Sequence, residues 1–481
     1  MKVNILLLPL ILLGSPTLHA GNLTEDNVNK AMAVIEEVVA AYGGEKRLST
    51  MNTITIRNET INIATGQSLK PEPPWDKNPS SGISAVDFKN KIFVTRSQGL
   101  AVGFEFNNGT IINGEQSFQL DYRAGTVAKI AKPDFDTSSG PFMRVTPALL
   151  IRTLKERSQN AYYLGETTID GQMYDVIGFS MAVGPAISLY FERESRLLRR
   201  SERVLANFGL VEYHFNDYED IDHIPFNRNF ALYLNGDLNI ERHNLSTNVN
   251  TDIEALTQVE ENLTELAAIV PDELSRQEIA EGVYLIGGSG TYAMFVEMED
   301  YIVAVGGAAG IAERIALLRE ILPAKPVEYG VITHHHFDHI LGVTAYEEEG
   351  ATVIASRAHR KIIEDKAKNA ENLKLKLVRK KHVLKDSSRR LQIIDIGPTA
   401  HTEHLLVAYL PEEGIVFEAD HFSMPQVGPV PPAVPSTKTF AKALKKHRIE
   451  ATTFLSAHSP RVGARQDLEE ALDKKLWTED R

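Results

Sequence analysis

Hydrophobic and polar residues alternate along much of the first half of the chain. The alternation is clear in residues 53–63, 187–191 and 211–218. Side chains that alternate in this way point to opposite faces of a β-strand, so each run predicts a strand with one buried face. The sequence Asn107-Asn108-Gly109 follows another strand-like run and is typical of a hairpin turn. These patterns predict a succession of antiparallel strands.

One helical pattern comes before the strands. Apolar residues recur at helical spacing within residues 25–47, and Gly43-Gly44 ends the run. Helix and strands together predict a β-rich antiparallel domain over residues 21–247. One early helix followed by a meander of strands is similar to the half-barrel of periplasmic lipoprotein carriers, which hold acyl chains in a concave sheet. The alternative is an accessory sheet that only packs on the neighbouring domain.

The second half of the chain has a different pattern, in which strands and helices follow one another. Residues 282–286 and 327–333 have the apolar runs of buried strands, and residues 311–322 have the spacing of an amphipathic helix. Strand, helix and strand in this order predict an α/β domain over residues 279–481.

A polar segment separates the two patterns, at residues 248–278. Its apolar residues recur every three or four positions: Leu256, Val259, Leu263 and Leu266. This spacing predicts a helical linker between the domains.

A cluster of histidines follows the strand that ends near residue 333. His334, His336, Asp338 and His339 lie within six residues, together with His335. Neutral imidazole and carboxylate are the natural ligands of Zn²⁺ where no thiolate is present. His334 and His336 are two residues apart, so they point the same way on an extended segment and can bind one ion. A polar loop with solvated histidines is the alternative.

Three more candidate ligands occur later in the chain, each beside an apolar run. His401 precedes the strand-like run 405–410, Asp420 ends the run that starts at Gly414, and His458 follows residues 454–457. Each of these residues thus adjoins a strand-like run, and the ends of strands are where an α/β sheet places the residues of a site.

The pattern His-x-His-x-Asp-His resembles the signature of the metallo-β-lactamase superfamily. Gly397-Pro398-Thr399-Ala400-His401-Thr402 is similar to a later turn of that family with one residue inserted before the histidine. The chain departs from the family at Val305-Gly306-Gly307, where an acidic residue is common, and at Ile340-Leu341-Gly342, where Gly-Gly is usual. Neither position binds metal in the family.

The resemblance implies an αββα sandwich over residues 279–481 and two metal ions. His334, His336 and His401 would hold one ion, and Asp338, His339 and His458 the other, with Asp420 bridging them. A bridging carboxylate makes the site more similar to the thioesterase, lactonase and phosphodiesterase branches than to the β-lactam-hydrolysing members. His335, His404 and His421 would support the ligands instead of binding metal.

The implied activity is hydrolysis by a zinc-bound hydroxide, with two Zn²⁺ as cofactors and iron or manganese as alternatives. Asp338 is the expected catalytic residue, since it would orient the hydroxide and carry its proton. The expected substrate is a small molecule with an ester or lactone bond, and the apolar segment with Met424, Val427 and Val430 could hold an apolar tail. A mononuclear iron dioxygenase, a phosphodiesterase or sulfatase, and a metal-dependent binding protein are the alternatives.

The composition limits the kinds of partner and metal site that the protein can have. The chain has 481 residues, a formal net charge of −13 and no cysteine. The negative charge argues against nucleic acid as a partner, and the lack of cysteine excludes disulfides and thiolate metal sites. The sequence leaves the oligomeric state open.

The first twenty residues have the pattern of a signal peptide. Lys2 precedes an aliphatic run from Val3 to Leu13, and Leu18-His19-Ala20 offers a cleavage region. The run is shorter than the roughly 20 residues that span a membrane, so we expect cleavage instead of anchoring. Residues 1–20 therefore predict a periplasmic or secreted protein.

Overall fold

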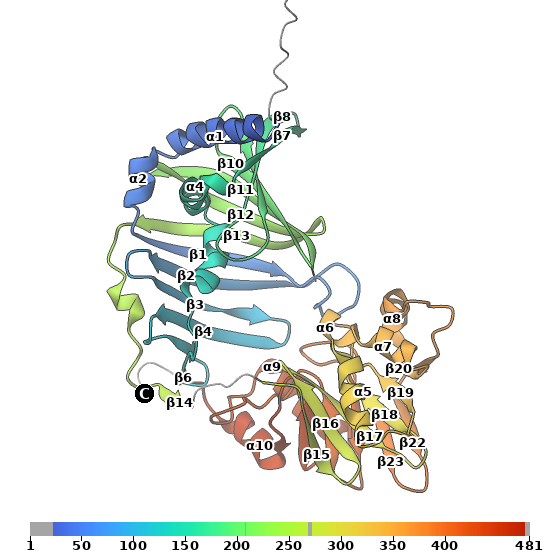
Figure 1. Ribbon diagram of the computed structural model, residues 1–481. Helices are drawn as coiled ribbons and strands as arrows, with labels where there is room; N and C mark the ends of the chain where they lie inside the picture. The colour runs from blue at the N-terminus through green and yellow to red at the C-terminus, as the bar shows by residue number, and fades with distance from the viewer. Residues whose placement is uncertain (1–22, 207, 268–271, 477–481) are drawn as a thin grey trace, which may run out of the picture.

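The computed structural model describes residues 23–206, 208–267 and 272–476. The predicted signal peptide, residues 1–20, lies outside the described residues. Two β-rich parts succeed one another along the chain: a large single sheet, then two smaller sheets with helices (Figure 1). None of the described helices is both long and apolar enough to cross a membrane.

The first part is built on a 14-stranded sheet, in the order β14-β6-β5-β4-β3-β2-β1-β13-β12-β11-β10-β9-β8-β7. Neighbouring strands pair antiparallel, as the alternation predicts, and β14 pairs parallel with β6. The strands are β1 Thr53–Ile63, β2 Lys77–Asp87, β3 Ile92–Ala101, β4 Phe104–Asn113, β5 Phe118–Asp121, β6 Thr126–Lys129, β7 Tyr162–Ile169, β8 Gln172–Phe179, β9 Ile187–Glu192, β10 Leu198–Leu205, β11 Gly209–Ile221, β12 Ile224–Leu234, β13 Asp237–Val249 and β14 Thr264–Leu266.

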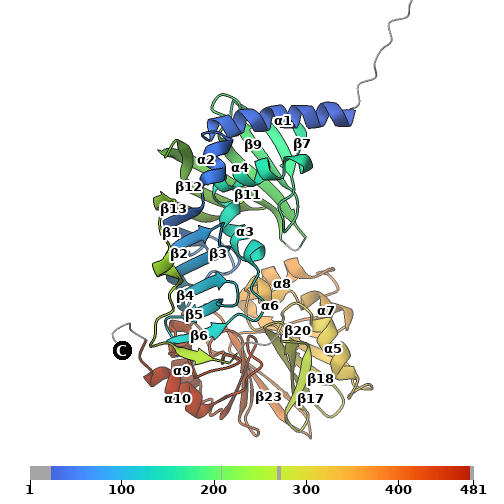
Figure 2. The same ribbon diagram turned by 60° about the vertical axis from the view of Figure 1, so that its left-hand side comes forward.

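Four helices cover one face of this sheet: α1 Leu23–Ala41, α2 Glu45–Thr50, α3 Phe135–Arg144 and α4 Pro147–Glu156. α1 buries Ala31, Ile35, Val38 and Val39, which recur at helical spacing, against apolar residues of the sheet. The predicted early helix is therefore present, and a short second helix follows Gly43-Gly44. Figure 2 shows α3 beside β3, on the same face of the sheet as α4.

The segment after β13 covers the opposite face, and here the predicted helix over residues 248–278 is wrong. The described part of this segment contains the end of β13, a 3-10 turn at Glu254–Thr257, the short strand β14 and the start of β15. Ile253 and Leu263 are buried against Ala85 and Val94 of the sheet. The apolar residues thus pack one by one on a sheet face, and an extended segment can do this without helical geometry.

The predicted hairpin turn at Asn107-Asn108-Gly109 is also wrong. These residues lie inside β4, and the chain turns at Val102-Gly103 instead. Gly103 has φ +84, and a Cβ atom there would lie 3.0 Å from the backbone and the side chain of His401. The turn therefore needs glycine because its tip packs closely against the second half of the chain.

The second part is a sandwich of two sheets. The first sheet has the order β15-β16-β17-β18-β19-β20-β21 and the second β22-β23-β24-β25-β26-β27. Their strands are β15 Ser275–Ala280, β16 Val283–Gly288, β17 Thr291–Glu297, β18 Ile302–Val305, β19 Val327–Val331, β20 Thr352–Ser356, β21 Leu375–Val378, β22 Lys381–Lys385, β23 Arg390–Asp395, β24 Leu406–Leu410, β25 Ile415–Glu418, β26 Thr453–Ser456 and β27 Gly463–Ala464.

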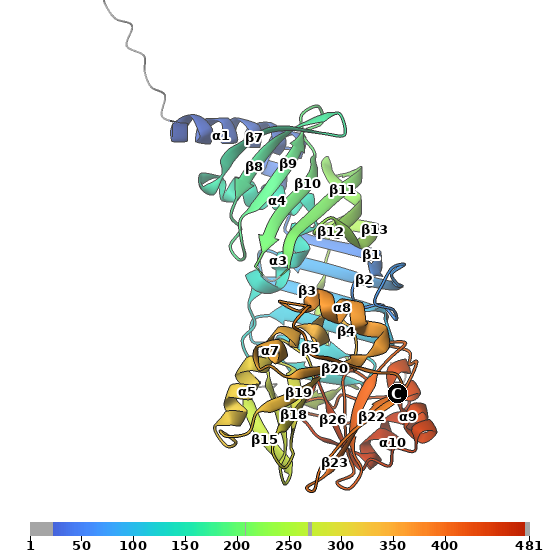
Figure 3. The same ribbon diagram turned by 90° about the vertical axis from the view of Figure 1, so that its right-hand side faces the viewer.

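Helices lie on both outer sides of the sandwich: α5 Ile311–Arg319, α6 Phe337–Ile340, α7 Val343–Glu348, α8 Arg360–Lys366, α9 Pro435–His447 and α10 Arg465–Asp473. Figure 3 shows α5 and α7 on one side and α9 and α10 on the other. Along β16, Val283 and Leu285 belong to the core between the sheets, whereas Tyr284 and Ile286 pack under α5 and α7. This two-sided burial confirms the predicted αββα arrangement, preceded by a β-rich region.

Candidate metal centre

The candidate ligands lie just after three strands of the sandwich and in one of its loops. β19 leads into His334, His335 and His336, and the short helix α6 then carries Asp338 and His339. Asp420 follows β25, and His458 follows β26. His401 is in the loop between β23 and β24. The strand ends bring together residues that are more than a hundred positions apart, as expected for an α/β site.

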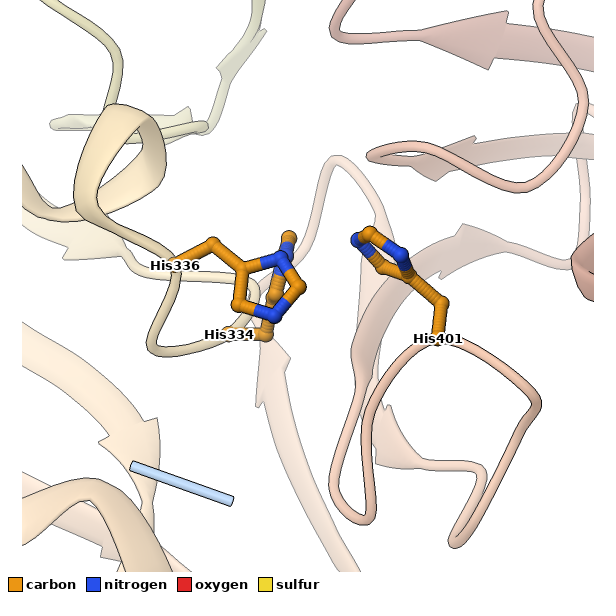
Figure 4. Close-up of side chains that lie close together, drawn as sticks. All are labelled: His334, His336 and His401. Atoms are coloured by element: carbon orange, nitrogen blue, oxygen red, sulfur yellow. The ribbon is translucent and has the colours of Figure 1, made fainter. Parts of the chain in front are cut away.

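His334, His336 and His401 form the first group, in which one possible ligand atom from each residue lies within 4.8 Å of the others. Figure 4 shows the ring of His401 facing those of His334 and His336. All three side chains are buried. The buried atoms His334 Nε2, His336 Nδ1 and His401 Nε2 have no hydrogen-bond partner among the described residues. Buried nitrogens without a partner are rare, so these three fit a cation.

The other ring nitrogens of this group are held by oxygen atoms. His401 Nδ1 donates to the carbonyl of Val102 at 2.7 Å, and His336 Nε2 donates to the carbonyl of Ser68 at 2.9 Å. A donated proton on one nitrogen leaves a lone pair on the other, which is the form that binds metal. Burial, followed by the neighbouring histidines, holds the pKa of His334 and of His336 well below the usual value, so both rings are neutral.

Asp338, His339, Asp420 and His458 form the second group, again within 4.8 Å. His458 Nε2 lies 2.8 Å from Asp420 Oδ1 and 3.1 Å from His339 Nε2. Burial alone would raise the pKa of Asp338, but His339 and Gln67 hold it below its ordinary value. The group therefore offers two carboxylates and two imidazoles, the ligand types of zinc and of other divalent cations.

Asp420 lies between the two groups. Its Oδ2 is 3.3 Å from His334 Nε2, 3.5 Å from His401 Nε2 and 3.1 Å from His339 Nε2. Within the part of the chain that the structure describes, Asp420 Oδ2 itself has no hydrogen-bond partner. The structure thus brings all seven sequence-predicted residues together, with Asp420 central. Their binding of metal stays a prediction.

The three histidines expected to support the ligands lie outside both groups. His335 Nε2 donates to the Ser68 carbonyl at 2.9 Å, and burial lowers the pKa of His335 to about 4. His404 Nδ1 contacts Asp395 Oδ2 at 2.9 Å, and His421 Nε2 contacts Thr399 Oγ1 at 2.9 Å. Thr399 also receives the backbone N–H of His401 at 3.1 Å, so His421 acts on the loop that carries a candidate ligand.

Sequence reasoning missed the contribution of the N-terminal sheet. The loop after β1 reaches α6, where Gly66 accepts a hydrogen bond from the Phe337 N–H at 3.1 Å (Figure 1). Gln67 Nε2 donates to Asp338 Oδ1 at 2.8 Å. Together with the carbonyls of Ser68 and Val102, these contacts reach the site from the N-terminal part of the chain. That part has no metal-binding motif. Every residue has a backbone carbonyl, so the sequence does not mark the carbonyls that contact the candidate ligands. Gly103, at the β3–β4 turn, is the only sequence feature that could have indicated a close contact there.

The comparisons concern the second half of the chain. Residues 304–475 match the family model of the metallo-beta-lactamase superfamily. Among solved structures, a metallo-β-lactamase from Pontibacter korlensis is 19% identical and covers 42% of this chain and 97% of its own, with a TM-score of 0.34. The metallo-β-lactamase FIM-1 from Pseudomonas aeruginosa, in a mono-zinc form, is 23% identical over 42% of this chain and 93% of its own, with a TM-score of 0.33.

A metallo-β-lactamase from Hirschia baltica is 21% identical over 41% of this chain and 95% of its own, with a TM-score of 0.33. No curated protein matches the chain. With the ligand geometry and the αββα sandwich described above, the family match identifies the C-terminal region, residues 304–475, as a member of the metallo-β-lactamase superfamily, whose fold is that of metal-dependent hydrolases.

Proposed function

We propose that the protein is a dinuclear zinc hydrolase that cleaves an ester or lactone bond. The observation that carries the proposal is the pair of ligand groups with Asp420 between them. His334, His336 and His401 would hold one cation, and Asp338, His339 and His458 the other. A site for a single cation would need the ligand atoms of only one group. The close arrangement of the second group therefore supports two cations.

Two bound Zn²⁺ ions would supply Lewis acidity toward the scissile carbonyl and a water of lowered pKa, about 7 in zinc enzymes. Asp338 would hold a proton at Oδ2, because Gln67 holds its Oδ1 while Oδ2 faces His339 and His458. Gln67 thus fixes one carboxylate oxygen and leaves the other oriented toward the second ligand group. The carbonyls of Ser68 and Val102 keep His336 and His401 in the orientation that binds metal.

The proposed substrate carries an apolar tail. The residues predicted from the sequence to contact this tail need correction. Met424 and Val430 are each only 3% exposed and belong to the core of the sandwich, so of the three expected residues only Val427 is partly exposed. Phe337 supports the proposal instead, since it is 47% exposed beside Asp338. A cavity of about 1060 Å³ is lined by Ile61 and Leu100, from strands whose loops reach the metal centre, and offers a second apolar surface.

Metal analysis and an activity screen test this function. We expect close to two divalent ions per chain, mostly zinc, after purification without chelators. Among ester, lactone, thioester, β-lactam, phosphodiester and sulfate substrates, the ester or lactone should be hydrolysed fastest, and faster for long acyl chains than for short ones. A single iron per chain would favour a mononuclear dioxygenase, and preferred cleavage of a phosphodiester or sulfate would favour those alternatives.

We also propose that the protein is exported to the periplasm or secreted. Lys2, the aliphatic run from Val3 to Leu13 and Ala20 support a cleaved signal peptide. The mature chain should begin near Gly21. N-terminal sequencing that finds Met1 on a cytoplasmic product would contradict export and leave the metal chemistry untouched.

A further inference from the structure

A second cavity, of about 620 Å³, lies on the helix-covered face of the N-terminal sheet. Phe142 and Val145 line it from α3 and the residues after it, and Phe93 and Ile240 line it from the sheet. None of its lining residues belongs to the metal centre. Its apolar surface therefore belongs to the N-terminal sheet and α3, outside the metal centre.

Three arginines line this cavity: Arg144 at the end of α3, Arg203 on β10 and Arg242 on β13. Its lining includes no aspartate or glutamate, although the chain has 64 acidic and only 51 basic residues. Other arginines of β10 have partners, such as Arg199, which pairs with Glu192 at 2.9 Å. Arg144 Nε is buried without a hydrogen-bond partner among the described residues, and the guanidinium has the neutral Tyr213 hydroxyl as its neighbour instead of a carboxylate. The positive charge of the cavity is uncompensated by any lining side chain.

Two aromatic rings hold two of the arginines in place. Tyr213 and Phe230 stack with centroids 5.9 Å apart. The Arg203 guanidinium lies over Tyr213 at 5.8 Å and donates from Nε to its hydroxyl at 3.2 Å. The Arg242 guanidinium lies over Phe230 at 5.6 Å and donates from Nε to Thr60 Oγ1 at 3.1 Å. Both bonds use Nε–H, so the terminal nitrogens keep their N–H donors for an anion.

We propose that this cavity binds a small anionic amphiphile, with a carboxylate, sulfate or phosphate head on an apolar body. The head would accept hydrogen bonds from Arg144, Arg203 and Arg242, and the body would pack on Phe93 and Phe142. This site and its ligand class are separate from the metal centre and do not depend on the hydrolase proposal.

Burial supports the choice of an anion. Burial, with the nearby Arg203, lowers the pKa of Arg144, and burial lowers that of Arg242. Such shifts mean that the charged form is poorly solvated where it stands. An anion bound among the three guanidinium groups would replace the lost hydration, whereas a neutral ligand would leave the charges as they are.

Calorimetric titration of the full chain with decanoate, octanoate and inorganic phosphate tests the proposal. Each methylene that becomes buried should tighten binding roughly fourfold, so decanoate, with two more methylenes, should bind about fifteenfold more tightly than octanoate. Arg144→Gln and Arg203→Gln should each weaken decanoate binding about tenfold or more, because each removes a charge-assisted hydrogen bond. Arg242 is a poorer choice of variant, since it also lines the larger cavity.

The controls separate this site from the others. Arg228→Gln, an exposed position on β12 that pairs with Glu219, should leave decanoate binding unchanged. His336→Ala should leave the part of decanoate binding that depends on Arg144 and Arg203 unchanged, so this test does not depend on whether the hydrolase proposal holds. Decanoate binding that is insensitive to both Arg144→Gln and Arg203→Gln, or phosphate binding as tight as decanoate binding, would overturn the proposal. Circular dichroism identifies a misfolded variant. If Arg144→Gln or Arg203→Gln misfolds, decanoate binding by the other variant tests the proposal.

Discussion

The two halves of the molecule use their polar residues in different ways. In the sandwich, the candidate metal ligands are side chains at strand ends, and four of the seven lie within six residues of sequence. In the N-terminal sheet, the contacts to the same centre come mostly from backbone carbonyls, those of Ser68 and Val102. Side chains that bind metal leave a motif in the sequence, whereas carbonyls that orient those side chains leave none.

The halves nevertheless meet at one site. Gln67 and Ser68 approach it from the loop after β1, and Val102 from the β3–β4 turn. The N-terminal part of the chain therefore contributes contacts to the candidate metal centre. The comparison predicts that losing a metal ligand of the sandwich has a large effect, and that losing a contact from the N-terminal sheet has a smaller one.

The largest effect should follow removal of a ligand from the sandwich. His336→Ala takes one of three nitrogens from the first group, so hydrolysis should fall roughly a thousandfold or more and the metal content should drop. Elemental analysis with steady-state kinetics measures both. His382→Ala changes a histidine of β22 outside both groups and serves as the control. Full activity in His336→Ala would show that the first group is not the catalytic centre.

Acid should destabilise the protein through its buried neutral histidines. His335 has a pKa of about 4 when folded, against 6.5 for an ordinary histidine, because burial disfavours its charged form. Between these values the unfolded chain binds a proton that the folded chain does not. The free energy of unfolding should therefore fall as the pH falls from 6.5 to 4, by about 1.4 kcal/mol per pH unit from this group.

Urea unfolding of chelator-treated protein at several pH values measures this slope. Burial also lowers the pKa of His334, His336 and His359, so the total slope should be steeper than one group provides. His335→Gln should remove one proton from the difference in bound protons between the unfolded and folded chains. The free energy of unfolding should then depend less steeply on pH. Identical slopes in the two proteins would contradict a neutral buried His335.

The sandwich and its site could be predicted because few arrangements satisfy their chemistry. Metal ligands must be particular side chains, so the cluster that contains His334 could be recognised from the sequence, and the resemblance to the metallo-β-lactamase superfamily then grouped His401 and Asp420 with it. The succession of N-terminal strands was equally predictable, since alternation reports one buried face.

Tertiary packing decided what the sequence could not predict. The segment around Leu256 has helical spacing, yet its residues pack singly on the sheet. Asn107-Asn108-Gly109 has the composition of a turn, but the tight contact with His401 places the turn at Gly103. Gln67 and Asp338 are 271 positions apart, so their contact depends on how the two halves pack.

A smaller effect is expected at Gln67, where the N-terminal sheet touches a carboxylate of the centre. Gln67→Ala frees Asp338 Oδ1, and the less well oriented carboxylate should lower kcat/KM about tenfold. The metal content should stay unchanged. The acidic limb of the pH profile should move to higher pH, because Asp338 loses the hydrogen bond that stabilises its charged form. Gln172→Ala, in the exposed β7–β8 hairpin, is the control. A Gln67→Ala enzyme with unaltered kinetics and pH profile would mean that the contact does not position Asp338.

The smallest effect should come from the turn that carries Val102. Gly103→Ala puts a Cβ 3.0 Å from His401 in a backbone of φ +84, so the turn must shift and lengthen the bond between the Val102 carbonyl and His401 Nδ1. Gly44 has a similar φ of +88 with nothing within 4 Å of the added atom, so Gly44→Ala strains the backbone alone. Both variants should lose roughly 1–3 kcal/mol of stability, as expected for a non-glycine residue held at positive φ. Only Gly103→Ala should also lower kcat/KM, by roughly threefold for a weakened hydrogen bond to a ligand. Equal activity in the two variants, at matched losses in Tm, would show that the carbonyl of Val102 does not act on His401, and that the N-terminal sheet influences the metal centre through Gln67 and Ser68 alone.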